Sequence, residues 1–368
     1  MGNKHKKRQK QKQKKELQNK LKRENLPFVS LCTPTFNRRP FIKQCIKNML
    51  KQTYPLEKLE WVVIDDGTDK VGDIFDEVND IKVKYISLNT KISLGKKRNL
   101  MHKESSGEIL IYIDDDDFYP EDRVMHCVTE LLKSKKLIAA SSILHVWFTN
   151  DPIYRFGPYG INHGTAGTFA FKKELLNITG YNETACFAEE KEFLHNYSIP
   201  MIQLDPFKTI LVFNHIHNTV DKRKLIVNCE NKFVNKTSLN IEHFIKDKDT
   251  IDFYTNRLNK ELENYKEGLP ENKHDLMEAR KQRDLMKTIQ SEQENKMNQQ
   301  KKPKLPPNTI GGMNPDGTQV VLGIKELAEM VNNLQEVKKQ HQQTIEIQNK
   351  KLTEQCEIIE ELKKKLNN

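Results

Sequence analysis

Short apolar runs alternate with amphipathic stretches through the first third of the chain. The runs have the length of buried strands, and in the stretches between them apolar residues recur at helical spacing. The expected strands are residues 28–32, 61–64, 82–87 and 109–113, and the expected helices are residues 41–52, 73–79, 95–106 and 123–132. This alternation predicts an α/β fold, in which a parallel sheet carries helices on both faces.

A seven-residue apolar repeat runs through residues 321–368. With Ile324 as the first a position, six of the seven a positions and three of the six d positions are apolar. Such heptads are typical of a coiled coil, so we expect a homo-oligomer formed through this segment, or a helical partner for it. The alternative is a lone amphipathic helix that packs on the body or lies in solvent.

The composition changes along the chain and indicates five segments. Apolar runs and aromatic residues are concentrated in the part that we expect to fold, and Pro and Gly are concentrated in one later stretch. The expected segments are a basic disordered tail (residues 1–25), a folded domain (26–235), a polar helical extension (236–300), a Pro/Gly linker (301–320) and the coiled coil (321–368).

Most of the net charge belongs to the N-terminal tail. Residues 1–25 hold 11 Lys/Arg and two Glu, so the rest of the chain carries only +1 of the net charge of +10. The charge therefore does not indicate a nucleic-acid-binding fold. Three roles stay open for the tail: contact with nucleic acid, contact with an anionic surface, or a solubilising or sorting function.

Several classes of protein are not expected. No apolar run approaches the ~20 residues of a transmembrane helix, and the first residues lack the apolar core of a signal peptide. Six Cys without a CxxC pair fit a reducing compartment rather than a disulfide framework or a zinc site. We expect a cytoplasmic protein without a transmembrane segment, in a host cytoplasm or a virion if the source is viral.

Acidic side chains follow two of the expected strands. Asp65 and Asp66 follow residues 61–64, and Asp114–Asp117 follow residues 109–113. The carboxyl ends of parallel strands meet at one edge of a sheet, so these groups should face one crevice. Crowded carboxylates favour a hard divalent cation, which often shares its oxygen ligands with substrate phosphates. Asp114–Asp117 therefore predict a metal-diphosphate site, and the alternative is a solvated acidic loop.

Three segments at these strand ends resemble the glycosyltransferase family 2-like enzymes of the GT-A fold. They read VSLCTPTFNRRPFI, EWVVIDDGTD and GKKRNLMHKESSGEILIYIDDDDFYPEDRV, and their order and spacing match the family. The resemblance implies a Rossmann-like sheet, a Mn²⁺ or Mg²⁺ cofactor, and inverting transfer of a sugar from a nucleotide-diphosphate donor, typically a UDP-sugar, to a hydroxyl acceptor on a glycan or protein. The alternative is an inactive transferase-like scaffold that oligomerises through its coiled coil.

The same resemblance implies residues that bind the nucleotide. Asp66 would accept a hydrogen bond from the base, and Arg98 would contact the nucleotide side of the site. The residues expected to line the base pocket are Thr33, Pro34 and Thr35.

The run of four aspartates takes the part of the family's DxD motif, in which one Asp touches the ribose or the metal and another ligates the metal. Four consecutive Asp leave the register open, because Asp114 with Asp116 and Asp115 with Asp117 both fit. We favour Asp116 as the metal ligand, with Asp114 and Asp117 as further metal ligands. Asp114 and Asp115 are also expected to contact the nucleotide.

A catalytic base is expected in residues 164–194, which resemble the family's acceptor segment. Glu189 and Glu190 stand where the family carries Glu-Asp. An inverting transfer needs one carboxylate to remove the proton of the acceptor hydroxyl. We favour Glu190 and keep Glu189 as the alternate. The other interpretation is that both are surface positions at the start of a charged helix.

Two histidines follow the apolar run of residues 209–213. His215 and His217 are two residues apart, which would place both on one face of a strand. Relatives often supply a further metal ligand from this region, and we favour His217 for a Mn²⁺ site. The alternative is that both are ordinary polar residues.

Overall fold

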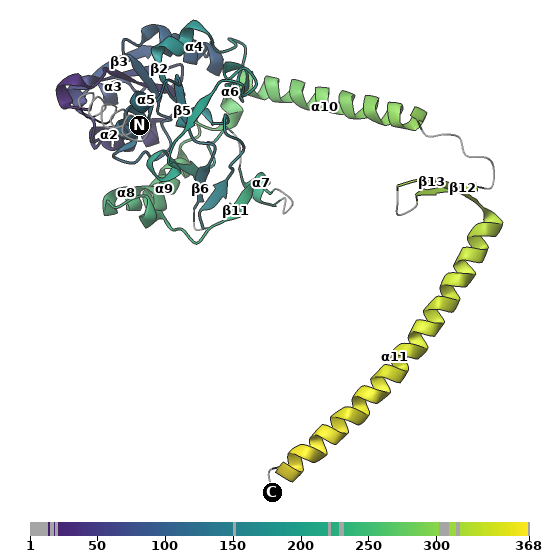
Figure 1. Ribbon diagram of the computed structural model, residues 1–368. Coiled ribbons are helices and arrows are strands. Elements are labelled where there is room, and N and C mark those ends of the chain that lie inside the picture. The colour runs from purple at the N-terminus through teal and green to yellow at the C-terminus, as the bar shows by residue number, and fades with distance from the viewer. Residues whose placement is uncertain are drawn as a thin grey trace, which may run out of the picture. The chain divides into compact units, whose positions relative to one another are not determined.

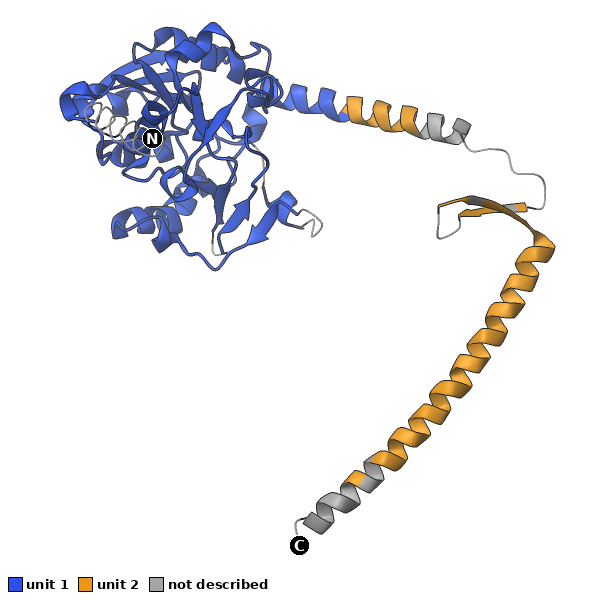
Figure 2. Ribbon diagram, viewed as in Figure 1, with its two compact units in different colours: residues 1–284 blue, residues 285–368 orange. Residues whose placement is uncertain are grey.

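The computed structural model describes residues 14, 18, 21–149, 152–219, 222–227, 232–301, 309–313 and 317–366. They fall into two compact units, residues 1–284 and residues 285–368 (Figure 2). Most of the basic tail and residues 302–308 of the expected linker lie outside the described residues, and the predictions for them stay predictions.

A seven-stranded sheet organises the first unit (Figure 1). Its strands are β1 (Val29–Thr35), β2 (Leu59–Asp65), β3 (Lys82–Ser87), β4 (Ile109–Tyr112), β5 (Ile138–Ala140), β8 (Ala170–Lys172) and β9 (Met201–Gln203). Their order is β3-β2-β1-β4-β8-β5-β9, and β8 is antiparallel to β4 and β5. The four strands predicted from sequence lie next to one another and are parallel, as expected.

Side chains of the central strands alternate between two cores. Trp61 and Val63 of β2 face one core with the helices α2 (Arg39–Leu50), α3 (Gly72–Phe75) and α5 (Arg123–Lys133). Val62 and Ile64 face the other core with α4 (Leu94–Glu104) and α6 (Glu190–Phe193). Because a strand points successive side chains to opposite faces, this pattern needs helices on both sides. The predicted α/β fold is confirmed.

A second sheet lies beside the first. It contains β6 (Leu144–Phe148), β7 (Tyr154–Phe156), β10 (Leu211–Asn214) and β11 (Val234–Lys236), in the order β10-β6-β7-β11, and the short helix α7 (Arg223–Val227) follows β10 in the chain. Phe118 and Leu211 exchange two backbone hydrogen bonds of 3.1 and 2.9 Å. These bonds attach the loop that follows β4, which holds the four aspartates, to the start of β10.

The folded body extends beyond residue 235. The helices α8 (Lys248–Asp252) and α9 (Leu258–Asn264), joined by the π-helical turn η7 (Phe253–Arg257), pack on the second sheet. Tyr254 stacks on Phe213 with 3.8 Å between the ring centroids, and Leu262 is buried. Apolar side chains of η7 and α9 therefore belong to the core, and the packed body continues past the expected boundary at 235.

The C-terminal part contains two long helices and a hairpin. They are α10 (His274–Lys301), the antiparallel pair β12 (Thr309–Met313) and β13 (Gln319–Gly323), and α11 (Ile324–Leu366). The hairpin occupies part of the stretch expected to be a linker. The single helix α11 agrees with the predicted helical segment, and its coiled-coil pairing stays a prediction. Within the described ranges, no helix is long and apolar enough to cross a membrane.

Candidate active site

A cavity of about 560 Å³ lies at the carboxyl edge of the first sheet. The loop that follows β4 contributes Asp114–Asp117 to its lining, and β1 contributes Pro34 and Thr35. Residues from later in the chain complete it, among them Glu190, Lys222 and Lys273. The sequence-predicted carboxylates Asp114–Asp117 and Glu190 therefore line the same space, whereas Asp65 and Asp66, which were expected to face the same crevice, are not part of its lining.

A larger groove of about 760 Å³ runs between α2 and α9. Several of its charged side chains are paired with one another or with neighbours: Arg39 with Asp69 and Asp73, and Lys47 with Asp249. Partly exposed salt bridges of this kind are common on protein surfaces and do not indicate a functional site. The reactive groups gather in the smaller cavity, which we take as the candidate site.

The four aspartates differ in what surrounds them. Asp117 accepts a 2.9 Å hydrogen bond from the backbone N–H of Phe213. The Asp117 carboxylate thus fixes the aspartate loop to β10. Asp115 is buried, and its Oδ2 has no hydrogen-bond partner among the described residues. Asp114 lies against Gly167, where a Cβ would stand 2.4 Å from Asp114 Oδ2, so only glycine leaves room for this carboxylate.

Burial makes these carboxyl groups hard to ionise together. It raises the pKa of Asp115 to about 7 and the pKa of Asp114 to about 6, and the charge of Asp116 adds to both shifts. Asp116 behaves differently: although burial opposes its ionisation, the hydrogen bond from His215 and the charge of Arg38 hold its pKa below the usual value. Asp116 is therefore the carboxylate of the run that stays ionised most readily.

Asp116 is the centre of a small polar cluster. His215 Nε2 lies 3.1 Å from Asp116 Oδ2, and the Arg38 guanidinium lies 3.5 Å from the same oxygen. Arg38 also lies 3.5 Å from Asp115 Oδ1, and both groups are buried. One arginine thus offsets part of the negative charge of two neighbouring carboxylates.

The two histidines that follow β10 have different surroundings. Both ring nitrogens of His217 are buried without a hydrogen-bond partner among the described residues, and the ring packs against Tyr265. The ring beside the aspartates belongs to His215 instead. β10 ends at Asn214, so the two histidines lie in a turn, where the alternation of a strand does not apply and the two rings need not share a face.

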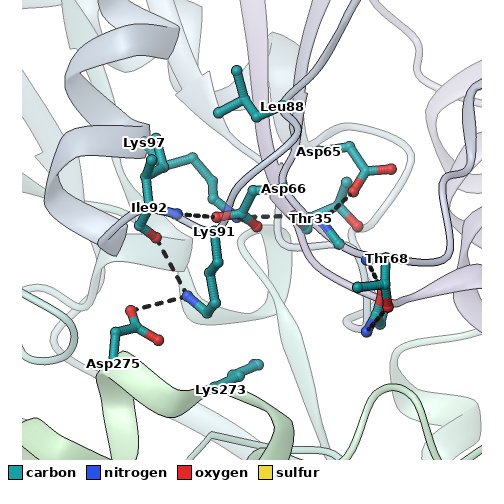
Figure 3. Close-up of polar contacts among 12 residues, drawn as sticks. Thr35, Asp65, Asp66, Thr68, Leu88, Lys91, Ile92, Lys97, Lys273 and Asp275 are labelled. Carbon is teal, nitrogen blue, oxygen red and sulfur yellow. Dashed lines mark hydrogen bonds and ion pairs between the residues drawn. The ribbon is translucent and has the colours of Figure 1, made fainter.

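Asp66 is buried in a tight network (Figure 3). Its carboxylate accepts hydrogen bonds from Lys97 Nζ and, at 3.0 Å, from the backbone N–H of Ile92. Lys97 Nζ also donates to the carbonyl oxygen of Thr35 at 2.9 Å, which ties α4 to the end of β1. Burial lowers the pKa of Lys97, and the charge of Asp66 opposes this shift. Asp66 thus has a lysine partner that sequence reasoning missed, and its predicted contact with the base stays a prediction.

Arg98 pairs with a carboxylate of the acceptor segment. Its Nε lies 2.7 Å from Glu189 Oε1, and both side chains are buried. The guanidinium carbon lies 4.5 Å from the ring centroid of Tyr112 and 5.7 Å from that of Tyr181. Arg98 Nη1 has no partner among the described residues, although the residue lines the cavity. Arg98 is therefore placed to brace Glu189, and its predicted contact with a nucleotide stays a prediction.

Glu190 is the carboxyl group of the pair that faces the cavity. It begins the short helix α6, directly after the buried Glu189. Burial raises the pKa of Glu190 to about 7, and the charge of Glu189 adds to the shift. A carboxyl group that titrates near neutral pH can take up a proton during a reaction, which is what a general base must do.

The predicted base-pocket residues separate into two groups. Pro34 and Thr35 line the cavity. Thr33 is buried inside the sheet, where its Oγ1 accepts a 2.9 Å hydrogen bond from Trp61 Nε1. Thr33 is therefore not part of the cavity lining: it points to the same face of β1 as Thr35 but lies two residues further from the strand end, among the buried side chains of the sheet.

A divalent metal fits this site through two protein ligands. Among the described residues, no group of three or more His, Cys, Asp or Glu side chains is arranged to hold an ion. Asp116 and His215 are close enough to share one, and burial lowers the pKa of His215, which favours the neutral ring that a ligand needs. Mg²⁺ is commonly held by only one or two carboxylates together with substrate phosphates. Asp116 and His215 are therefore suited to an ion that binds together with a phosphorylated ligand.

Three functional candidates were not found by sequence reasoning. Lys97 stands beside the predicted Arg98, but adjacent residues of a helix point in different directions, and the spacing alone did not show which one meets Asp66. Arg38 had a signal, since it follows the end of the first expected strand. No sequence signal pointed to Lys273, because it lies far from the motifs in the sequence.

Comparison with known proteins identifies the region that holds most of these residues. Residues 30–188 match the family model described as glycosyl transferase family 2. This match confirms the resemblance predicted from the motifs at the strand ends. The match ends two residues before Glu190, so that the later part of the site, from Glu190 to Lys273, lies outside it.

Curated relatives share the same region. An uncharacterized glycosyltransferase from Haemophilus influenzae is 30% identical over 103 residues, which are 27% of this chain and 40% of that protein. The poly(ribitol-phosphate) β-N-acetylglucosaminyltransferase TarS from Staphylococcus aureus is 33% identical over 92 residues, which are 24% of this chain and 16% of that protein. The chain thus spans less than half the length of either relative.

Solved structures show lower identity. S. aureus TarS residues 1–349 in complex with UDP-GlcNAc has 21% identity and a TM-score of 0.43, and the match covers 51% of this chain and 58% of that one. The mannosyltransferase PcManGT from Pyrobaculum calidifontis, in complex with GDP-Man and Mn²⁺, has 20% identity and a TM-score of 0.41, covering 50% of this chain and 56% of that one.

The buried pair of Lys97 and Asp66 generates a stability prediction. Lys97→Met leaves a buried carboxylate without its counter-ion, which costs about 3–5 kcal/mol of the free energy of unfolding. Lys96→Met, at the adjacent exposed lysine, is the control and should change it by less than about 0.5 kcal/mol. Both values are measured by urea unfolding of the full chain.

A double variant separates the charge from the packing. Asp66→Leu combined with Lys97→Met removes both charges, so it should recover part of the stability that the single variant loses. If Lys97→Met is as stable as the wild type, the ion pair is not a structural requirement of the site.

Proposed function

We propose, on the premise that residues 30–188 form a glycosyltransferase family 2-like domain, that the protein transfers a sugar from a nucleotide-diphosphate donor to a hydroxyl acceptor. The observation that carries this proposal is one cavity lined by both Asp114–Asp117 and Glu190. The first group suits a metal-diphosphate, and the second suits removal of a proton. A glycosyl transfer needs both functions within reach of one sugar.

The donor half of the proposed site lies at the ends of β1, β2 and β4. Pro34 and Thr35 line the cavity beside the buried Asp66, where the base would bind. Asp114 and Asp115 remain the proposed contacts to the nucleotide. We propose a UDP-sugar as the donor, in keeping with the family resemblance and with the N-acetylglucosaminyltransferase named among the relatives.

Asp116 and His215 are the proposed ligands of a Mn²⁺ or Mg²⁺ ion. Bound there, the ion would offset negative charge on the departing nucleoside diphosphate. Arg38, buried beside Asp115 and Asp116, contributes fixed positive charge to the same place. Asp117 holds β10 through Phe213, which argues for a structural role of that carboxylate.

Glu190 is the proposed general base. As the acceptor oxygen bonds to the anomeric carbon, the bond from that carbon to the diphosphate breaks and its electron pair leaves with the diphosphate. The acceptor proton passes to the Glu190 carboxylate. Glu189 is less suited to this step, because its carboxylate is buried against Arg98. The Arg98–Glu189 pair would instead position Glu190 at the start of α6.

Donor turnover tests this proposal. With Mn²⁺ present, the wild-type chain should release UDP from at least one member of a UDP-sugar panel. Asp116→Asn and His215→Gln should each slow release by at least about 100-fold, because each removes a group that holds charge at the departing diphosphate. Release is measured by a coupled UDP assay.

His217→Gln is the matched control, since His217 is a neighbouring buried histidine without a contact to the aspartates among the described residues. It should retain turnover if the melting temperature shows that it folds. Failure of every UDP- and GDP-sugar would contradict the enzyme assignment and favour an inactive scaffold.

The raised pKa of Glu190 predicts the pH dependence of the reaction. The base must be ionised, and its pKa of about 7 lies above the usual value for Glu, so kcat/KM should rise with pH through about 7 and level off above it. Glu190→Gln should lower kcat by about 10²- to 10⁴-fold. A pH–rate profile and single-turnover assays measure both effects.

Glu192→Gln, on the exposed side of the same helix, serves as the control and should keep the wild-type profile. A profile that is flat between pH 5.5 and 8.5 in the wild type would argue against Glu190 as the base.

We also propose that the chain self-associates through α11. The a positions Val331, Ile345 and Leu352 are exposed on this helix, and burying such a stripe against a second copy would remove apolar surface from water. Ile345→Asp with Leu352→Asp should convert the oligomer to a monomer of 43.1 kDa. Sedimentation equilibrium measures the mass.

Ile347→Asp is the matched control for this prediction. Ile347 is as exposed as Leu352 but lies off the a and d stripe, so the variant should keep the wild-type mass. A wild-type chain that sediments as a monomer at high micromolar concentration would rule the proposal out.

A further inference from the structure

One segment from outside the family match lies against the candidate site. We call residues 265–276 the strap. Its first part is fixed to two loops. The Tyr265 hydroxyl donates to Asp69 Oδ2, in the loop that follows β2, at 2.7 Å. Asn37 Nδ2, in the loop that follows β1, donates to the carbonyl oxygen of Glu267 at 2.9 Å. Arg38, which also holds the aspartates, donates to the carbonyl oxygen of Gly268 at 3.3 Å.

At Gly268 the backbone of the strap lies very close to His217 and to the backbone of Asn37. A Cβ on Gly268 would stand 2.4 Å from His217 Nδ1 and 2.7 Å from the carbonyl oxygen of Asn37. No other residue fits there without moving the backbone. The burial of His217 is thus explained by the strap, and this explains why His217 is unsuited to the role predicted from its sequence position.

The other end of the strap is fixed as well. Asp275 accepts a 2.9 Å hydrogen bond from Lys91 Nζ, which Figure 3 shows beside the Asp66–Lys97 network. Leu276 is buried and lines the cavity together with Asp275. Because both ends are held, the residues between them have a defined place next to the cavity.

Lys273 lies between these two anchors and lines the cavity. Its Nζ donates to Thr219 Oγ1 at 3.0 Å and lies 5.9 Å from the ring centroid of Phe36. Burial lowers the pKa of Lys273 to about 7, the nearby Arg38 lowers it further, and Asp116 and Asp115 oppose the shift. The ammonium therefore shares the cavity with the aspartates.

Among the described residues, Lys273 lacks the kind of salt bridge that three basic residues lining the same cavity make. Lys97 pairs with Asp66, Lys91 with Asp275 and Arg98 with Glu189. Within the described ranges, no carboxylate oxygen lies within 4.0 Å of Lys273 Nζ. A half-buried ammonium without a counter-ion is less favourable than one with a partner, so the place of Lys273 in the cavity favours an anionic ligand.

We propose that Lys273 binds the diphosphate of the donor, so that the strap completes the nucleotide site from outside the family domain. This inference rests on the proposed function, which supplies the donor. A lysine is a common point-charge ligand for phosphate, and a charged hydrogen bond from it is shorter and stronger than a neutral one. Thr219 and Phe36 hold the ammonium in place without neutralising it.

The test compares ligands that differ only in phosphate. Calorimetry with Mn²⁺ measures UDP affinity for the full-length wild type and for Lys273→Met, and ligand-observed NMR measures uridine affinity. Lys273→Met should weaken UDP binding by about 10- to 100-fold, because a charge-assisted hydrogen bond is lost. Uridine binding should be unchanged, since uridine carries no phosphate.

Two variants act as controls. Lys273→Arg keeps the positive charge and should restore most of the UDP affinity. Lys266→Met changes an exposed lysine of the same strap and should bind UDP like the wild type. Thermal melting confirms that each variant folds.

The outcomes distinguish this inference from the proposed function. If the wild type binds neither UDP nor GDP, the proposed donor is wrong, and this inference falls with it. If the wild type binds UDP and Lys273→Met binds it equally well, the inference alone is overturned. Equal losses for UDP and uridine would also overturn it, because they would show that Lys273 supports the fold of the site rather than the diphosphate.

Discussion

The candidate site depends on one constraint: charges that leave water must be paired. The carboxyl edge of the sheet places Asp114–Asp117 in the lining of one cavity and buries Asp66 at the end of β2. Lys97 and Arg38 balance part of this charge, and each also bonds to the backbone of a neighbouring segment. The same interactions therefore neutralise the site and assemble it, because a buried ion pair with further hydrogen bonds keeps its partners in one arrangement.

This pairing of charges involves segments that are far from the motifs in the sequence. Arg38 follows β1, yet it donates to the carbonyl oxygens of His217 and Gly268. Lys91 follows β3 and reaches Asp275 at the start of α10. The family-like domain supplies the sheet and the aspartates, and the residues after 188 supply the proposed base, the histidine and the strap. The site is a property of the whole first unit rather than of the matched region alone.

Much of this arrangement follows from local patterns. Four apolar runs predicted β1 to β4, and the acidic residues that close two of them predicted the position of Asp66 and Asp114–Asp117, because the carboxyl ends of parallel strands share an edge. The direction of individual side chains was harder to predict. Lys97 and Arg98 are adjacent on α4, and their partners Asp66 and Glu189 come from segments whose packing no local pattern reveals. The choice between His215 and His217 depended on where β10 ends and on the strap, which are tertiary features.

The central claim is that these paired charges form a donor site that needs a divalent ion. Calorimetric titration of UDP into the full-length wild-type chain, with and without Mn²⁺, tests it most directly. The account predicts binding that is at least tenfold tighter with Mn²⁺ than without it, since Asp116 and His215 would hold an ion that also attracts the diphosphate. Absence of binding in both conditions, for UDP and for GDP, would contradict it.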